Sequence, residues 1–145
     1  MSGIVVGTDG SDEAHRALDW AMREAAARHT TLKVLAIVPA MASPWTGNPL
    51  SVPDGDHAVQ SVREAAERAV AASAAEIGDQ QPESVSVQAA IGYPAQALID
   101  ASKTADLVVV GSRGTGGFAA LLLGSTSTQV AHHASCPVVI VPTGR

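Results

Sequence analysis

Short apolar runs alternate with stretches of helical periodicity along this chain, and that alternation limits the possible folds more than any other feature. The runs lie at residues 4–6, 31–38, 84–91, 107–110 and 138–141. Between them, apolar residues recur every three or four positions, as on one face of a helix. Strands that alternate with helices pair in parallel, because each helix carries the chain back to the starting edge of the sheet. The sequence therefore predicts an α/β fold, with one doubly wound parallel sheet of five strands and helices on both faces.

Hydrophobic patterning also predicts where two of the strands lie. Residues 31–38 are apolar almost throughout, which is typical of a central strand buried on both faces. Residues 84–91 alternate between apolar and polar, which favours a half-exposed strand at a sheet edge. The first helix is expected to end near Arg28 and His29, whose side chains suit the negative end of a helix. The second is expected to end near Gly78.

Length and composition restrict the class of protein. The chain has 145 residues, which predicts a single domain spanning 1–145. Nine basic and fourteen acidic residues give a net charge of −5, which argues against nucleic acid or an anionic membrane as the main partner. No apolar run is long enough to span a membrane, and the first residues lack a signal-peptide pattern. With Cys136 as the single cysteine, expected to be a small buried hydrophobe, the sequence predicts a cytoplasmic protein.

Two glycines follow the fourth apolar run and indicate a phosphate site. Gly111 comes directly after residues 107–110, and Gly114 follows three positions later. Glycine has no Cβ, so backbone N–H groups near it can approach an anion closely. Arg113 stands between them, where it is placed either for a charge-assisted phosphate contact or as an exposed loop arginine.

A third glycine, Gly124, precedes a hydroxyl-rich segment that is expected to begin a helix. Ser125, Thr126 and Ser127 supply the hydroxyls, and Thr126 with Gln129 fits the spacing of a capping box. The free N–H groups and the positive dipole end of a helix favour phosphate. The two glycine segments together predict nucleotide or phosphate binding.

The spacing of these glycines resembles a known signature. Gly111-x-x-Gly114-x9-Gly124-Ser125 is similar to the glycine motif of the ATP-binding branch of the universal stress protein family. The resemblance extends from residues 5–11 through 92–95 to 136–138. It implies the strand order 3-2-1-4-5, in which the topological switch lies between the first and fourth strands. Folds of this type bind ligands at that switch.

The first strand ends at this switch with the turn cluster Gly7-Thr8-Asp9, which we assign to the same nucleotide site. The resemblance implies a nucleotide contact at Asp9, an adenine contact at Ile37 and a ribose contact at Val110. It also implies ATP as the ligand, with Mg²⁺ bound through the phosphates. Each residue has a simpler alternative, because Asp9 could cap a turn or helix and the two apolar side chains could be core.

The sequence favours a binding protein over an enzyme. It contains no Walker lysine, no G-x-S-x-G motif and no sharply placed general base. Gly114-x-Gly116-x-x-Ala119 mimics a dinucleotide fingerprint but follows the fourth strand instead of the first. The resemblance implies a stress-response regulator in which bound ATP sets conformation or partner choice. The alternatives are a slow ATPase, an AMP- or cyclic-AMP-binding module, and a dimerising interaction protein with an empty site.

Two further expectations concern surfaces. The run at 138–141 is apolar and lies at an edge in the implied order, so it invites pairing with another chain. The resemblance implies an antiparallel homodimer through this strand, whose length is limited by Pro142. Residues 39–55 hold four prolines and no periodicity, which predicts a functional or mobile loop near the adenine.

Overall fold

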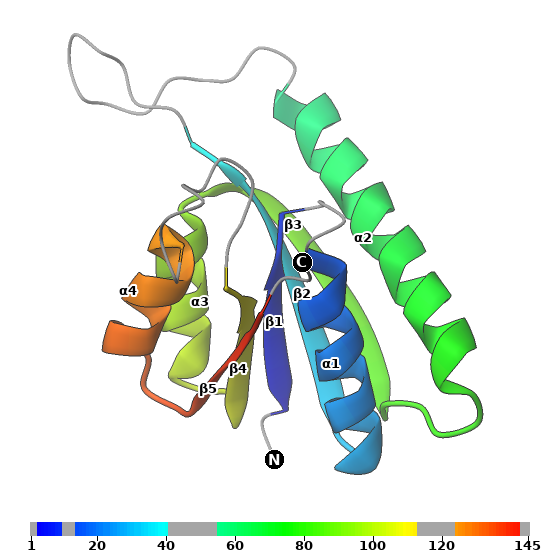
Figure 1. The fold of residues 1–145 in the computed structure, drawn as a ribbon. Coiled ribbons are helices and arrows are strands. Elements are labelled where there is room, and N and C mark those ends of the chain that lie inside the picture. Colours follow the sequence, from blue (N-terminus) through cyan, green and yellow to red (C-terminus); the bar gives the residue numbers. More distant parts are fainter. Residues whose placement is uncertain (1–2, 10–13, 41–54, 113–123, 143–145) are drawn as a thin grey trace, which may run out of the picture.

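The computed structural model describes residues 3–9, 14–40, 55–112 and 124–142. Within them five parallel strands form one sheet in the order β3-β2-β1-β4-β5 (Figure 1), which confirms the predicted α/β fold and strand order. In chain order the elements are β1 (Ile4–Thr8), α1 (Ala14–Ala27), β2 (Thr31–Pro39), α2 (Gly55–Ile77), β3 (Ser84–Gly92), α3 (Pro94–Ser102), β4 (Leu107–Gly111), α4 (Ser125–His133) and β5 (Val138–Val141).

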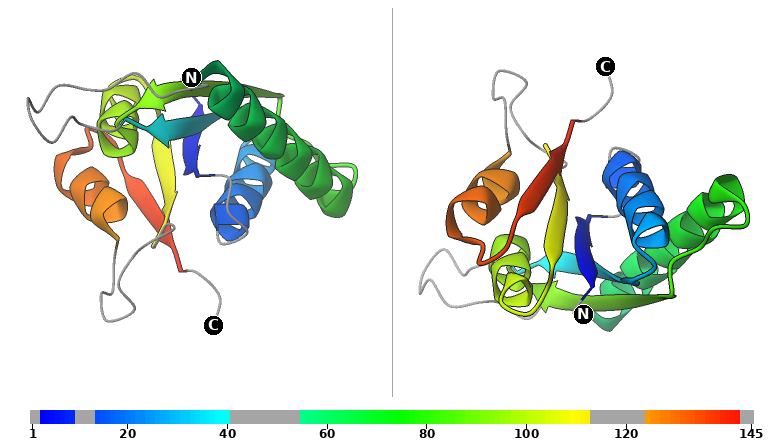
Figure 2. Two further views of the ribbon diagram at one scale, coloured as in Figure 1. Left: turned by 90° about the horizontal axis from the view of Figure 1, so that it is seen from above. Right: turned by 90° about the horizontal axis from the view of Figure 1, so that it is seen from below.

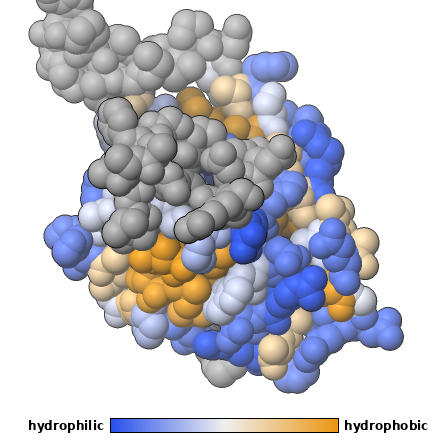
Figure 3. All heavy atoms as spheres, viewed as in Figure 1, coloured by the Kyte–Doolittle hydropathy of each residue, from blue (hydrophilic) through white to orange (hydrophobic). Residues whose placement is uncertain are grey.

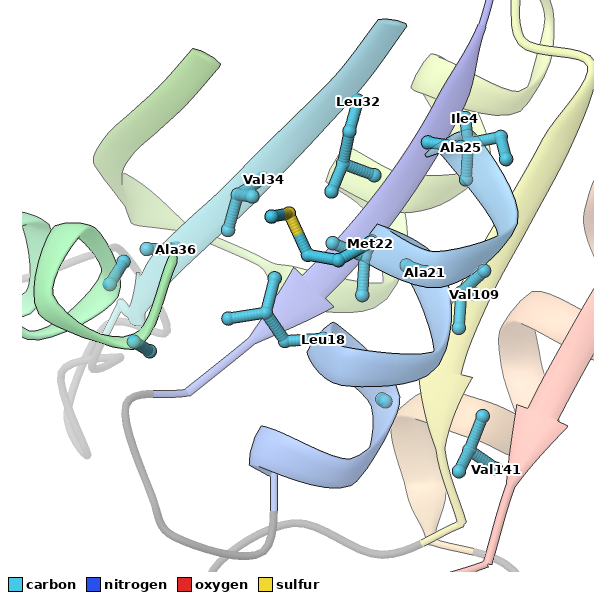
Figure 4. Close-up of a cluster of buried hydrophobic side chains, with 14 of the residues drawn as sticks. Ile4, Leu18, Ala21, Met22, Ala25, Leu32, Val34, Ala36, Val109 and Val141 are labelled. Atoms are coloured by element: carbon cyan, nitrogen blue, oxygen red, sulfur yellow. The ribbon is translucent and has the colours of Figure 1, made fainter. Parts of the chain in front are cut away.

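The helices cover the two faces of the sheet in pairs. Helices α1 and α2 lie on one face and α3 and α4 on the other (Figures 1 and 2). On the first face, Leu18 and Met22 of α1 point toward the strand side chains Leu32 and Val34 (Figure 4). A second buried cluster fills the other face with Val5, Leu35, Leu98, Val108, Val110 and Val130. Neighbouring residues of one strand thus enter different clusters, which is why the central strands are continuously apolar.

Strand positions agree with the hydrophobic patterns. The apolar β2 lies between β1 and β3, and β3 is an edge strand, as predicted. Ser84 and Ser86 of β3 are exposed, whereas the alternate valines pack on the first cluster. Arg63 of α2 donates from Nη1 to the carbonyl of Val87 at 3.0 Å. Helix α2 therefore contacts the backbone of the outer strand as well as its side chains.

The first strand is longer than the sequence pattern predicts. The prediction of a turn beginning at Gly7 was wrong, because Gly7 and Thr8 still belong to β1 and pair with Leu35 and Ala36 of β2. The glycine serves packing here. A Cβ on Gly7 would lie 2.8 Å from Cδ1 of Leu98, a buried side chain of α3. Glycine at this position therefore lets α3 pack closely on the sheet.

The starts of β1 and β4 are tied together by a reciprocal pair of hydrogen bonds. The Gly3 N–H donates to Oδ2 of Asp106 at 2.9 Å, and the Asp106 N–H donates to the Gly3 carbonyl at 2.8 Å. These two residues are separated by 103 positions in sequence. The contact therefore fixes the alignment of the two central strands where they begin.

Cys136 lies in the turn before β5 and is only partly buried, so the prediction of a fully buried residue was wrong. Its side chain packs against the second cluster with one side, because the turn lies at the margin of α4 and β5. Partial burial raises the pKa of the thiol above its ordinary value, and a hydrogen bond involving the Val108 backbone opposes that rise. The negative charge of Asp106 raises the pKa of the thiol further.

Among the described residues no helix is long and apolar enough to cross a membrane.

Two helix ends follow the sequence predictions, and at one of them a non-glycine residue, His29, adopts the left-handed conformation. Helix α2 ends before Gly78, which has a positive φ of 78°. After α1, it is His29 that takes the left-handed conformation, with φ 53°. The His29 N–H donates to the Ala26 carbonyl and the Thr30 N–H to the Ala25 carbonyl. This is a Schellman motif, whose left-handed position glycine usually occupies.

We expect His29→Gly to stabilise the protein. A Cβ in the left-handed region costs about 1–2 kcal/mol, and the greater freedom of glycine in the unfolded chain offsets part of that gain. The free energy of unfolding should rise by about 1 kcal/mol, which corresponds to a melting temperature higher by about 2–4 °C. Thermal unfolding measures this. His29→Ala is the control, since it removes the imidazole but keeps the Cβ, and an equal gain in that variant would contradict the explanation.

Candidate functional site at the carboxyl ends of β1 and β4

The central strands separate at their carboxyl ends. β1 pairs with β4 from Ile4 and Leu107 up to Val6 and Val109. Beyond that point β1 continues with β2, as far as Thr8 opposite Ala36, while β4 continues with β5. The two strands are thus hydrogen-bonded on opposite sides where they end. This is the topological switch at which parallel α/β sheets bind ligands.

The carbonyl of Ser112, just after β4, joins the two glycine segments. It accepts hydrogen bonds from the Gly124 N–H at 2.5 Å and from the Ser127 hydroxyl at 3.1 Å. The Ser112 N–H in turn donates to the Val141 carbonyl at 2.9 Å. The end of β4, the start of α4 and the end of β5 therefore meet at one residue. Ser112 is an unspecified position of the glycine motif, and the sequence pattern gave it no role.

The start of α4 differs from the predicted capping box. The helix begins at Ser125 with Gly124 as its N-cap, so Thr126 is its second residue and cannot cap it. Gly124 has no side chain that could cap this helix end. Instead, the hydroxyls of Ser127 and Thr128 donate back to the Gly124 carbonyl, at 3.0 Å and 2.8 Å. Backbone N–H groups in the first turn of a helix have no intrahelical acceptor, so this end is available to an anion.

The hydroxyl residues at this end have different exposures. Ser125 is exposed, Thr126 is half-buried, and Ser127 is 2% exposed. The Ser127 hydroxyl is already directed at two carbonyl oxygens of the protein. A phosphate contact by this hydroxyl stays a prediction, and the structure adds a role within the protein.

The structure brings several other predicted residues to the same end of the sheet. Gly7 and Thr8 finish β1, and Asp9 follows it with an exposed side chain. Ile37 near the end of β2 and Val110 near the end of β4 are 9% and 3% exposed, in the cluster beneath α3 and α4. Gly111 is the last residue of β4.

Some predicted features lie outside the described residues. These are Arg113 and Gly114 of the glycine motif and residues 41–54 of the proline-rich loop. The apolar run 118–123, an alternative place for contact with a second chain, also lies outside them. The residues that flank the proline-rich segment are described. The Ala40 N–H donates to the Gly92 carbonyl at 2.8 Å, which extends the pairing of β2 with β3 beyond Pro39.

In the part of the chain that the structure describes, no three His, Cys, Asp or Glu side chains form a group that could hold a metal ion. His132 and His133 occupy the last turn of α4, with ring centroids 6.3 Å apart. A Mg²⁺ ion bound through nucleotide phosphates needs few protein ligands. The carboxylate of Asp9 and the hydroxyl of Ser125 are oxygen groups of the kind that suits it.

A cavity of about 120 Å³ lies away from this site, near the amino ends of the strands. Its lining includes Thr31 and Lys33 of β2 and Thr104 after α3. Ligands of parallel α/β sheets bind at the opposite end, so we do not assign this cavity to the nucleotide site.

Comparison with known proteins agrees with the fold. The family model described as "Universal stress protein family" matches residues 1–142. The chain belongs to the universal stress protein family. A universal stress protein of Mycolicibacterium smegmatis is 37% identical over 139 residues, which cover 96% of this chain and 47% of the relative. The chain thus spans about half the length of the curated relatives it matches.

Two solved structures of universal stress proteins match nearly the whole chain. UspA from Lactobacillus plantarum has a TM-score of 0.70 and 23% identity, with 97% of both chains covered. A universal stress protein in complex with cAMP has a TM-score of 0.66 and 30% identity, and the match covers 98% of this chain and 97% of that one. The first likeness concerns the fold alone.

Proposed function

We propose that this universal stress protein binds an adenine nucleotide, ATP with Mg²⁺ held through its phosphates, at the carboxyl ends of β1 and β4. The observation that carries the proposal is the uncapped start of α4, tied through Ser112 to the end of β4. There the helix dipole and the first N–H groups favour a phosphate. This helix start lies at the topological switch, where a bound nucleotide would also contact β1 and β2.

Each part of the nucleotide has a proposed set of contacts. The backbone N–H groups of Ser125, Thr126 and Ser127 and the exposed Ser125 hydroxyl hold phosphate oxygens, and Gly124 at the N-cap leaves space for them. Asp9 faces the nucleoside side. Ile37 and Val110, whose side chains are buried beneath α3 and α4, border the base and the ribose. Arg113 and the glycines at 111 and 114 complete the phosphate site.

Cyclic AMP is the second candidate ligand. It is favoured by the universal stress protein in complex with cAMP, which is 30% identical to this chain. A cyclic phosphate carries one negative charge, so a single helix N-terminus neutralises much of it. ATP needs the additional positive charge of Mg²⁺ and of Arg113.

Isothermal titration with ATP·Mg²⁺, AMP and cAMP is the experiment that tests the proposed function. We expect binding of adenine nucleotides with a preference for ATP, and a loss of that preference when Mg²⁺ is removed. Tighter binding of cAMP than of ATP would select the second candidate. Binding of none of the three would contradict the function itself. Phosphate release under saturating ATP should be slow at most, since the sequence contains no general base sharply placed for catalysis.

Replacement of Gly114 tests the glycine motif directly. A Cβ at this position would oppose a close approach of phosphate or a left-handed backbone, at about 1–2 kcal/mol, and would remove hydrogen bonds of about 1 kcal/mol each. We therefore expect Gly114→Val to weaken ATP binding at least about tenfold while the protein stays folded. Gly78→Val is the matched control. A Cβ on Gly78 meets nothing within 4 Å, so it should lower stability through its positive φ but leave the affinity unchanged. Equal affinities of Gly114→Val and the parent would refute the phosphate site.

The proposal includes a homodimer through β5. This strand lies at the sheet edge, and Figure 3 shows a hydrophobic area on the face where Figure 1 places it. Carbonyls of Pro137 and Val141 accept bonds from β4, so those of Val138 and Ile140 point outward, because backbone groups alternate along a strand. Both flanking residues, 137 and 142, are prolines without an N–H. An antiparallel copy would therefore pair with Val139 opposite its own equivalent.

We expect Val139→Lys to shift the protein toward monomer in sedimentation equilibrium. Val139 packs against the first cluster and Ile140 against the second, so Ile140→Pro is added as a variant that acts through the strand backbone. It removes an outward N–H and leaves the hydrogen bonds to β4 intact. Both variants should be monomeric and folded by circular dichroism. An unchanged dimer in Ile140→Pro would place the interface elsewhere, with the run 118–123 as the alternative.

A further inference from the structure

Ser127 is a buried hydroxyl that bridges two segments of the candidate site. Its Oγ lies 3.1 Å from the Ser112 carbonyl oxygen and 3.0 Å from the Gly124 carbonyl oxygen, and the residue is 2% exposed. Both acceptor carbonyls belong to residues that border the candidate site. Gly124 is the N-cap of α4, and Ser112 is the residue directly after β4. The side chain therefore connects the two sides of the site across 15 positions of sequence.

The Ser112 carbonyl has the wrong charge to face a phosphate. A carbonyl oxygen is the negative end of a peptide dipole and repels an anion placed near it. Here that oxygen is held by two donors, the Gly124 N–H and the Ser127 hydroxyl. Removal of the hydroxyl takes away one of these donors on a residue that is 7% exposed, where water has little access to replace the lost bond.

We propose that Ser127 is a positioning residue through its side chain, whose hydroxyl sets the separation and orientation of the β4 end and the α4 start for phosphate and does not itself contact the ligand. The inference rests on the proposed nucleotide function. It assigns the affinity for phosphate partly to a hydrogen bond inside the protein. It also separates Ser127 from Ser125, whose exposed hydroxyl is placed for direct contact.

Two other residues provide matched controls. Thr128 donates to the same Gly124 carbonyl at 2.8 Å, and its bond stays within α4. Thr128→Val therefore removes a hydroxyl at the same helix end and keeps the link to Ser112. Ser102, which is 1% exposed, donates to the Ile99 carbonyl at 2.6 Å at the far end of α3. Ser102→Ala thus removes an equally buried hydroxyl far from the site.

Titration of each variant with ATP·Mg²⁺ and with adenosine tests the inference. Adenosine has no phosphate, so it reports on the nucleoside side of the site alone. Ser127→Ala should weaken ATP binding about tenfold through the misplaced backbone donors and leave the affinity for adenosine within about twofold. Ser102→Ala should lower the melting temperature to a similar extent without changing either affinity. Thr128→Val should retain the affinity of the parent for ATP.

The possible outcomes separate the inference from the function on which it rests. A parent protein that binds neither ligand would overturn the proposed function, and the inference with it. A parent that binds ATP and a Ser127→Ala variant of equal affinity would overturn the inference alone. Equal losses for ATP and adenosine would do the same, because they would indicate general damage. If Ser127→Ala does not fold, Ser127→Cys takes its place, since a thiol is a weak donor of similar size. It should show a smaller loss confined to ATP, and an unchanged ATP affinity would again overturn the inference.

Discussion

The parallel pairing of β1 with β4 is the interaction on which the rest of the structure depends. Val6 and Val109 face each other across it, and both are fully buried. The reciprocal bonds between Gly3 and Asp106 align the two strands at their start. Because each strand is covered by helices on both faces, the pair separates two hydrophobic clusters and belongs to both. The pairing also ends early, and the candidate site lies where it ends.

The described part of that site is built mainly from backbone groups. This suits a protein with a net charge of −5, which repels a polyanionic ligand at long range. A helix N-terminus attracts phosphate through partial charges and adds nothing to the net charge. Such a site depends on the exact placement of peptide groups, so hydrogen bonds that orient them matter as much as ligand contacts do. The bridge from Ser127 to Ser112 is an interaction of this kind.

The two edges of the sheet differ in chemistry. On β3 the outward face is polar, and Arg63 of α2 donates to the strand backbone. On β5 the four residues are all apolar and stand between Pro137 and Pro142. Charged and polar groups discourage strand addition, whereas a short apolar edge permits it over a limited length. The asymmetry supports one specific self-pairing in preference to open-ended association.

Much of this fold is determined by local sequence. Hydrophobic patterning reports burial directly, so apolar runs located every strand and the period of two predicted the edge position of β3. Gly78 predicted the end of α2, because glycine adopts a positive φ readily. The strand order came from the family resemblance, because pattern alone does not order strands. The glycine motif indicated the site because glycine and hydroxyl residues have intrinsic backbone preferences.

Other features were decided only by the tertiary structure. Gly7 belongs to β1 because it pairs with Leu35 of β2. Thr126 does not cap α4 because the N-cap is Gly124, two residues earlier, whose N–H is held by the Ser112 carbonyl. Ser112 and Ser127 meet only because β4 and α4 are packed together. In each case the partner comes from a distant segment. A single stretch of sequence encodes which of its faces is buried, but the group that a buried residue meets depends on how the whole chain is folded.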